Sequence, residues 1–233
     1  MFDLLSRNRR WSISFLTAAL VAFIGLSACG GGDGDTPAVQ NTAEALAEVL
    51  VEDTQEQITI GISMYLLVDD AEDPNPAVSS RRTEEELTGI LARMNEIWGQ
   101  ANVRLELQTL ETMVVDREVL KEVGTGNIRA FFDRLGEDIP FTETGLISGF
   151  YTRRIGGPNG ITPLGSRWYM VMDEPSVFDH RVSSHEVGHI LGLRHTLGDR
   201  GRLLYPGTNG MDLTPEEITL TRYVAMELLK AQK

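Results

Sequence analysis

The spacing of apolar residues divides much of the chain into recognisable elements. Residues 58–68 (ITIGISMYLLV) are rich in apolar and β-branched side chains and predict a first strand. Residues 83–98 place apolar side chains at the i, i+3, i+4 and i+7 positions of one helical face. The start of that helix is marked because Thr83 and Glu86 have the spacing of a capping box.

The rest of the pattern continues with strands and helices. Alternation over residues 103–110 predicts a second strand, and residues 127–135 predict a helix; two further strands are expected at 145–152 and 167–174. Residues 214–217 mark a last helix, with a threonine cap, a proline in the first turn and a glutamate that completes a second capping box. This order predicts an α/β (α+β) domain with a mixed sheet packed against helices.

The N-terminal segment has the features of an export signal. Arginines lie among residues 7–10, and the apolar stretch that follows is shorter than the about 20 residues needed to span a bilayer. Its end, Leu26-Ser27-Ala28-Cys29, resembles the bacterial lipobox, in which the cysteine carries the lipid. An ordinary secretory signal with an incidental cysteine and a single membrane anchor are the alternatives. We expect an exported lipoprotein.

These features predict three regions in the chain. Residues 1–28 form a signal peptide, residues 29–56 a Gly/Asp-rich flexible tether that is anchored through lipid on Cys29, and residues 57–233 the folded domain. The expected location is the bacterial cell envelope, at the outer membrane or cell surface. The single cysteine excludes an internal disulfide. A net charge of −13 argues against a nucleic-acid partner, since binding phosphates needs clustered Lys and Arg. The sequence does not indicate an oligomeric state.

An acidic loop follows the first strand. Residues 69–76 (DDAEDPNP) carry carboxylates of the kind that bind structural Ca²⁺, but their spacing matches no EF-hand loop. We therefore favour a solvated loop over a calcium site.

Three of the four histidines lie within residues 185–195 (HEVGHILGLRH). On a helix, His185 and His189 project from one face and can direct ring nitrogens to a single point. Gly192 suits a left-handed turn at the helix end, which would bring His195 back as a third ligand. Three histidine ligands leave a fourth position for water, the arrangement of a catalytic rather than a structural Zn²⁺. Glu186 lies about 100° around the helix from His185 and suits a general base better than a ligand.

This arrangement predicts hydrolysis by a zinc-activated water. Zinc lowers the pKa of its water towards about 7, and Glu186 would accept the proton and pass it to the leaving group. One alternative is a catalytically silent envelope lipoprotein, for adhesion or as a scaffold, whose zinc only stabilises the fold. The carboxylate of Glu186 favours catalysis over that alternative. A second alternative is a zinc hydrolase of a non-protein substrate.

The motif His185-Glu186-x-x-His189-x-x-Gly192-x-x-His195 matches the metzincin signature at all five defining positions. The chain therefore resembles metzincin zinc metallopeptidases, and matrixins among them. The resemblance implies a zincin fold: a twisted mixed sheet with two long helices, and a small C-terminal subdomain ending in a helix. It also implies a zinc endopeptidase with one catalytic Zn²⁺, a protein or peptide substrate, and a substrate-pairing edge strand within residues 155–165.

One position departs from this family's pattern. Metzincins carry a methionine in a tight turn beneath the zinc, and residues 202–207 (RLLYPG) resemble the matrixin form of it with Leu204 in place of methionine. Met211 would require a different register, so we favour Leu204-Tyr205-Pro206 as the turn. Leu and Met are close in volume, and the exchange usually costs under about 1.5 kcal/mol. Tyr205 is a candidate for the substrate pocket, with packing as the alternative.

Overall fold

The computed structural model describes residues 56–135, 147–174 and 178–230. The predicted signal peptide, the predicted lipidation site Cys29 and all but the last residue of the predicted tether lie outside these ranges. None of the helices in the described ranges is long and apolar enough to cross a membrane.

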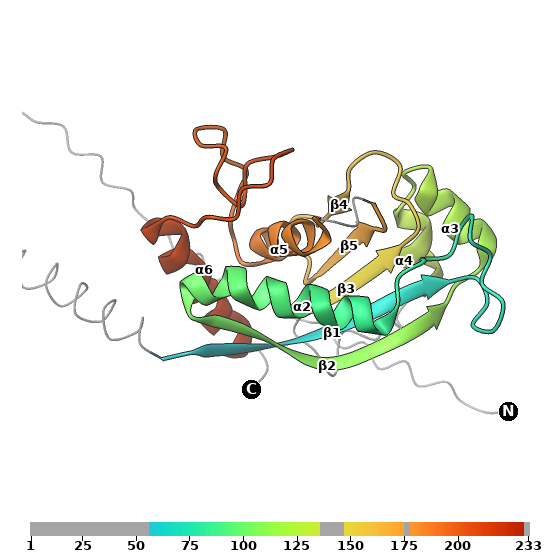
Figure 1. The fold of residues 1–233 in the computed structure, drawn as a ribbon, viewed down its shortest axis with the longest axis horizontal. Helices are drawn as coiled ribbons and strands as arrows, with labels where there is room; N and C mark the ends of the chain where they lie inside the picture. The colour runs from blue at the N-terminus through green and yellow to red at the C-terminus, as the bar shows by residue number, and fades with distance from the viewer. Residues whose placement is uncertain (1–55, 136–146, 175–177, 231–233) are drawn as a thin grey trace, which may run out of the picture.

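A five-stranded mixed sheet forms the centre of the molecule, with strand order β2-β1-β3-β5-β4 (Figure 1). The strands are β1 (Ile58–Val68), β2 (Val103–Val114), β3 (Ile147–Thr152), β4 (Gly160–Ile161) and β5 (Trp168–Met172). The neighbours β2-β1, β1-β3 and β3-β5 are parallel, whereas β4 pairs antiparallel to β5 at the sheet edge. The predicted α/β class with a mixed sheet is confirmed.

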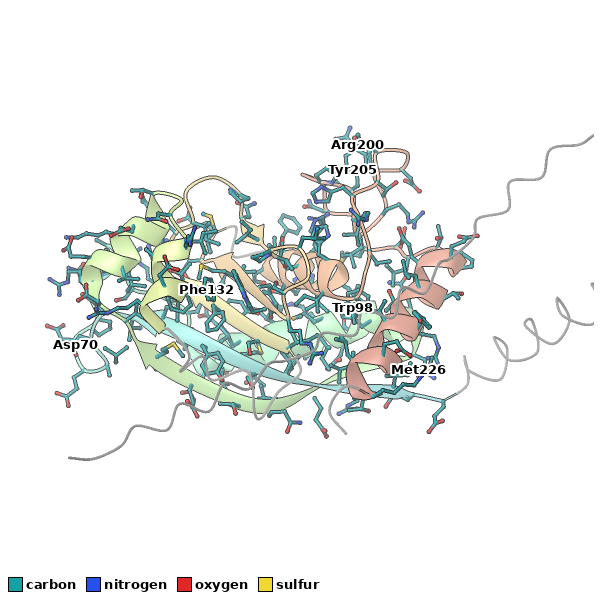
Figure 2. All side chains as sticks on the ribbon, turned by 180° about the vertical axis from the view of Figure 1, so that it is seen from behind. Asp70, Trp98, Phe132, Arg200, Tyr205 and Met226 are labelled. Atoms are coloured by element: carbon teal, nitrogen blue, oxygen red, sulfur yellow. The ribbon has the colours of Figure 1, made fainter. Side chains whose placement is uncertain are left out.

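One face of the sheet is covered by α2 (Glu84–Trp98) and α5 (Asp179–Ile190), which lie side by side in Figure 1. The predicted capping box of α2 is present: Glu86 N donates to Thr83 Oγ1 at 3.2 Å, and Thr83 N donates to Glu86 Oε2 at 2.8 Å. The apolar face of α2 packs into one core with alternate residues of β1 and with α5. Trp98, at the end of α2, is fully buried in that core (Figure 2).

The opposite residues of β1 face a second core, beside α3 (Arg117–Gly124) and α4 (Arg129–Leu135). There Tyr65 stacks on Phe150 with ring centroids 5.3 Å apart. Helix α3 was not predicted from the sequence. It is short and buries only Leu120 and Val123, so its pattern is too brief to distinguish from a polar loop.

The last helix, α6 (Pro215–Lys230), returns to the beginning of the domain. Its predicted capping box is present, with Glu217 N donating to Thr214 Oγ1 and Thr214 N to Glu217 Oε2, both at 3.3 Å. Within α6, the buried Arg222 donates from Nη1 to the carbonyl of Ala101 and from Nη2 to that of Glu56, each at 2.9 Å. The C-terminal segment is thereby fastened to the start of β1.

Candidate metal centre

The helix that carries the histidines ends in a left-handed turn. Gly192 has φ +88°, a conformation that glycine adopts without strain. Gly192 N donates to His189 O at 3.2 Å, and Leu193 N donates to Gly188 O at 2.9 Å, the two bonds of a Schellman motif. This turn reverses the chain after α5, and His195 comes back to the face that carries His185 and His189.

The three imidazoles meet through their Nε2 atoms. His195 Nε2 lies 3.1 Å from His185 Nε2 and 3.2 Å from His189 Nε2. On the far side of two rings, His185 Nδ1 lies 2.8 Å from Leu203 O and His189 Nδ1 lies 3.0 Å from Leu193 O. Since a carbonyl can only accept, both Nδ1 atoms donate, and the Nε2 lone pairs of these two rings are directed toward the common point.

This arrangement fits a tetrahedral cation. Ligand nitrogens about 2.0–2.1 Å from zinc lie roughly 3.3 Å from one another, close to the separations seen here. Backbone carbonyls that hold Nδ1–H are the usual partners that orient metal-binding histidines. Burial lowers the pKa of His185 to about 4, so its ring is in the neutral, metal-binding form near pH 7. The three histidines are therefore a candidate zinc site.

Glu186 lies beside this site and is buried. Burial raises the pKa of its carboxyl to about 7, against the opposing effect of the nearby Arg181 charge. A Cβ atom added to Gly160 would lie only 2.8 Å from Glu186 Oε1, so the bare backbone of β4 passes next to this carboxyl. Thr162 Oγ1 donates to the Glu186 carbonyl oxygen at 3.1 Å and ties the end of β4 to α5.

An open cleft of about 530 Å³ contains the histidines and Glu186. One wall is formed by residues 157–162, which include β4, and the other by residues 206–209 of the loop beyond α5. The candidate residues thus face a hollow with room for part of a substrate.

The structure places Leu204, and not Met211, beneath the histidine helix. Leu204 is fully buried, and its Cδ2 lies 3.0 Å from the position of a Cβ atom on Gly188. Met211 is 36% exposed on the loop. Pro206 lines the cleft, whereas Tyr205 is only partly buried and is not among the lining residues. Tyr205 lies in the loop that projects beyond the helices (Figure 2).

Comparisons with known proteins give similarity of fold. No protein-family model matches the chain, and no curated protein matches it. Among solved structures, a chain of a chaperone–substrate complex has a TM-score of 0.54 and 13% identity, with 74% of this chain and 35% of that chain covered. This chain therefore spans about a third of the length of that one. An archaemetzincin from Methanopyrus kandleri has a TM-score of 0.43 and 16% identity, with 74% and 96% covered. Similarity of fold alone does not establish a function.

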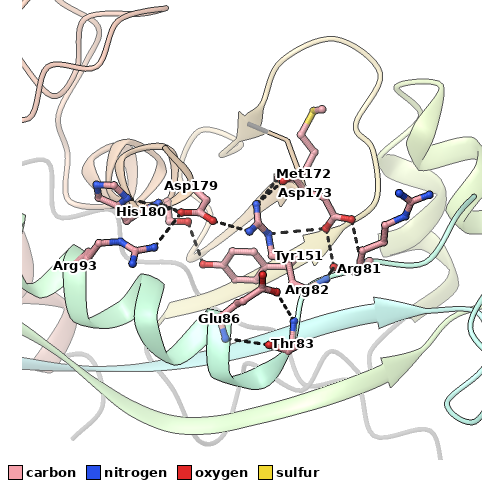
Figure 3. A network of polar contacts seen from close by, with 12 residues as sticks. Arg81, Arg82, Thr83, Glu86, Arg93, Tyr151, Met172, Asp173, Asp179 and His180 are labelled. Atoms are coloured by element: carbon pink, nitrogen blue, oxygen red, sulfur yellow. Dashed lines mark hydrogen bonds and ion pairs between the residues drawn. The ribbon is translucent and has the colours of Figure 1, made fainter. Parts of the chain in front are cut away.

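Sequence reasoning missed the buried ion pairs that hold the first turn of α5 (Figure 3). Asp179 lies inside the first turn of α5, and its Oδ2 accepts from Arg82 Nη1 at 2.6 Å. Arg82 also donates from Nη2 to the carbonyl of Asp173 at 2.6 Å, while Asp173 Oδ1 accepts from Ser80 Oγ at 2.7 Å. Charged residues next to turns usually lie at the surface, so the sequence carries no signal for this network.

A second missed residue is Arg181, which lies one helical turn before His185 and is only 6% exposed. Its position four residues before the first histidine of the motif was the available signal, because residues i and i+4 share one helical face.

Proposed function

We propose that the chain is a zinc-dependent endopeptidase of the metzincin type. One observation carries this proposal: three histidine Nε2 atoms converge next to the buried carboxyl of Glu186, in a single open cleft. A structural zinc site would have four protein ligands and no need of this carboxyl. The combination favours catalysis over a silent scaffold.

In this proposal each residue has a defined task. His185, His189 and His195 hold one Zn²⁺, and the carbonyls of Leu203 and Leu193 orient the first two rings. When bound, the zinc ion supplies a Lewis acid and lowers the pKa of water. Glu186 takes up the proton of the attacking water and releases it to the leaving amine. Without metal, burial raises the pKa of this carboxyl to about 7, close to the pH at which it would have to exchange protons.

The proposed substrate is a protein or peptide in extended conformation. Strand β4 ends the sheet order, and its backbone lies next to Glu186. A peptide added to this edge would gain main-chain hydrogen bonds without demanding a particular sequence. We further propose that the enzyme is exported and anchored in the bacterial cell envelope by lipid on Cys29; the basic, apolar and lipobox-like segments of residues 1–29 support this.

The test measures zinc content per chain and cleavage of an unfolded protein by purified wild type, Glu186→Ala and the exposed control Glu85→Ala. We expect about one zinc in each, full activity in the control, and at least a hundredfold loss in Glu186→Ala. Absence of zinc, or undiminished cleavage by Glu186→Ala, contradicts the proposal. Bound zinc without proteolysis would favour the scaffold, or, if a non-peptide ester is hydrolysed, the alternative hydrolase.

A further inference from the structure

Arg181 places a positive charge in the wall of the cleft, and the chemistry proposed above does not use it. It lies on α5, four residues before His185, and its side chain lines the same cleft as the histidines and Glu186. The residue is 6% exposed, so its guanidinium is largely removed from bulk water. Burying a cation is costly unless it is paired with an anion and hydrogen-bonded.

The guanidinium is held in a fixed orientation by neutral acceptors. Nη2 donates to Leu203 O at 2.7 Å and to Tyr205 O at 2.6 Å, and Nε donates to Gly210 O at 3.3 Å. Within the described ranges, no carboxylate forms an ion pair with it at 4.0 Å or less. The backbone of the loop thus fixes the group without neutralising its charge.

The remaining nitrogen, Nη1, is open to a ligand. It forms no hydrogen bond with a described residue, and it is not one of the enclosed side-chain atoms that lack a partner. Arg181 lines the cleft, and Nη1 is the nitrogen of its guanidinium for which the loop carbonyls provide no acceptor. A preoriented N–H group that carries a positive charge matches a carboxylate better than a neutral acceptor.

We propose that Arg181 binds a carboxylate of the substrate and makes the cleft selective for it. This inference rests on the proposed peptidase function. The carboxylate comes either from an Asp or Glu side chain near the scissile bond or from the C-terminus of a peptide; both present the same planar anion. The chain has a net charge of −13 and therefore repels an anionic group overall, so a carboxylate needs a local cation in the cleft to bind there.

The test measures binding without cleavage. The zinc-loaded full chain with Glu186→Gln is titrated into dye-labelled peptides, and anisotropy gives Kd. In the first arm, one Glu is moved along a neutral sequence, and each peptide is compared with its Gln counterpart. In the second arm, a neutral peptide with a free C-terminus is compared with its amide. We expect a preference of at least tenfold (about 1.4 kcal/mol) for the carboxylate in one arm or both.

Variants then assign the preference to Arg181. Arg181→Met, added to Glu186→Gln, abolishes the ratio, whereas the exposed control Arg104→Met, with the same change in net charge, preserves it. Arg181→Lys keeps part of the ratio because it keeps the charge. Ratios near one in both arms, or a ratio that survives Arg181→Met, overturn the proposal. If Arg181→Met does not fold, the two peptide arms and Arg181→Lys decide. A guanidinium site predicts that lysine lowers the preference for the carboxylate, so a ratio that Arg181→Lys leaves unchanged overturns the proposal.

The outcome is separable from that of the proposed function. If the Glu186→Gln chain prefers the Glu peptide but the chain with Glu186 intact cleaves none of the peptides, the carboxylate site is supported and the peptidase activity is contradicted. If the chain cleaves Glu and Gln peptides equally well, the peptidase activity is supported and the carboxylate site is contradicted.

Discussion

Glu186 illustrates how a single buried group can couple chemistry to stability. Its pKa in the folded chain, about 7, lies above the ordinary value of 4.5 because burial disfavours the charged form. The neutral carboxyl therefore contributes stability that is fully present below about pH 4.5 and is lost as the pH rises through about 7. The ionised form of Glu186, which catalysis requires, therefore destabilises the metal-free fold.

Glu186→Gln is expected to stabilise the metal-free protein at pH 8 and to leave its stability nearly unchanged at pH 4. The reason is that glutamine stays neutral where the buried carboxyl has to ionise. The gain at pH 8 should be on the order of 3 kcal/mol. Thermal unfolding in excess chelator at both pH values measures it. Equal melting temperatures of variant and wild type at pH 8 would contradict the assigned pKa.

Gly192→Ala is expected to cost about 1–2 kcal/mol and to weaken zinc binding. The backbone at this position has φ +88°, and an added Cβ would lie 3.1 Å from Val224 Cγ2. Relief of this strain shifts the turn that positions His195. Chemical unfolding and competition with a chelator measure the two effects. Gly198→Ala is the control, since an added Cβ there meets no atom within 4 Å.

Leu204 should tolerate methionine better than alanine. Leu204→Met preserves volume and is expected to cost under about 1.5 kcal/mol with zinc binding retained. Leu204→Ala opens a cavity beneath Gly188 and should cost about 2–5 kcal/mol. Denaturant unfolding separates these values. A larger loss from Met211→Ala than from Leu204→Ala would show that the turn has the other register.

At the scale of elements, α5 is held at its first turn and near its middle by contacts from other segments. Its first turn is bound through Asp179 to Arg82, which directly precedes the cap of α2. Its C-terminal half is bound through His185 to the carbonyl of Leu203. The position of the histidines relative to the cleft walls therefore depends on α2 and on the loop beyond α5, as well as on the helix itself.

Arg82→Met is expected to destabilise the protein by about 3–5 kcal/mol, because it leaves the buried carboxylate of Asp179 without its main partner and removes one of the cations beside Asp173. Asp179→Asn should remove part of the cost when it is combined with Arg82→Met. Urea unfolding of both single variants and the double variant forms the cycle that measures this coupling. Strict additivity would show that the two side chains do not stabilise each other.

The elements differ in how far the sequence could predict them. The starts of α2 and α6 were predictable because each capping box is a local pattern. The three histidines were predictable because their spacing converts directly into helix and turn geometry. The acceptors of Arg82 and Arg181 could not be predicted, since they come from segments that only the fold brings near. Strand β4 has two residues, too few for any alternation.

For the whole molecule, zinc should contribute to global stability as well as to chemistry. His195 belongs to the segment after α5, and a metal held by all three histidines would join that segment to the helix. Zinc at a hundredfold excess over its Kd is expected to add about 2.7 kcal/mol, which chelation removes. Differential scanning calorimetry with and without chelator measures the shift. His195→Ala should reduce it strongly, and an undiminished shift would place the metal elsewhere.

Arg222 has a mechanical consequence. It donates hydrogen bonds to the carbonyl of Ala101 and to that of Glu56, the first residue of the described domain. Tension applied to the chain upstream of Glu56 is therefore first resisted by α6 and by the start of β1. The residues that line the cleft make none of these contacts. In a protein pulled from its N-terminal side, we expect the hydrogen bonds of Arg222 in α6 to break before the histidines are displaced.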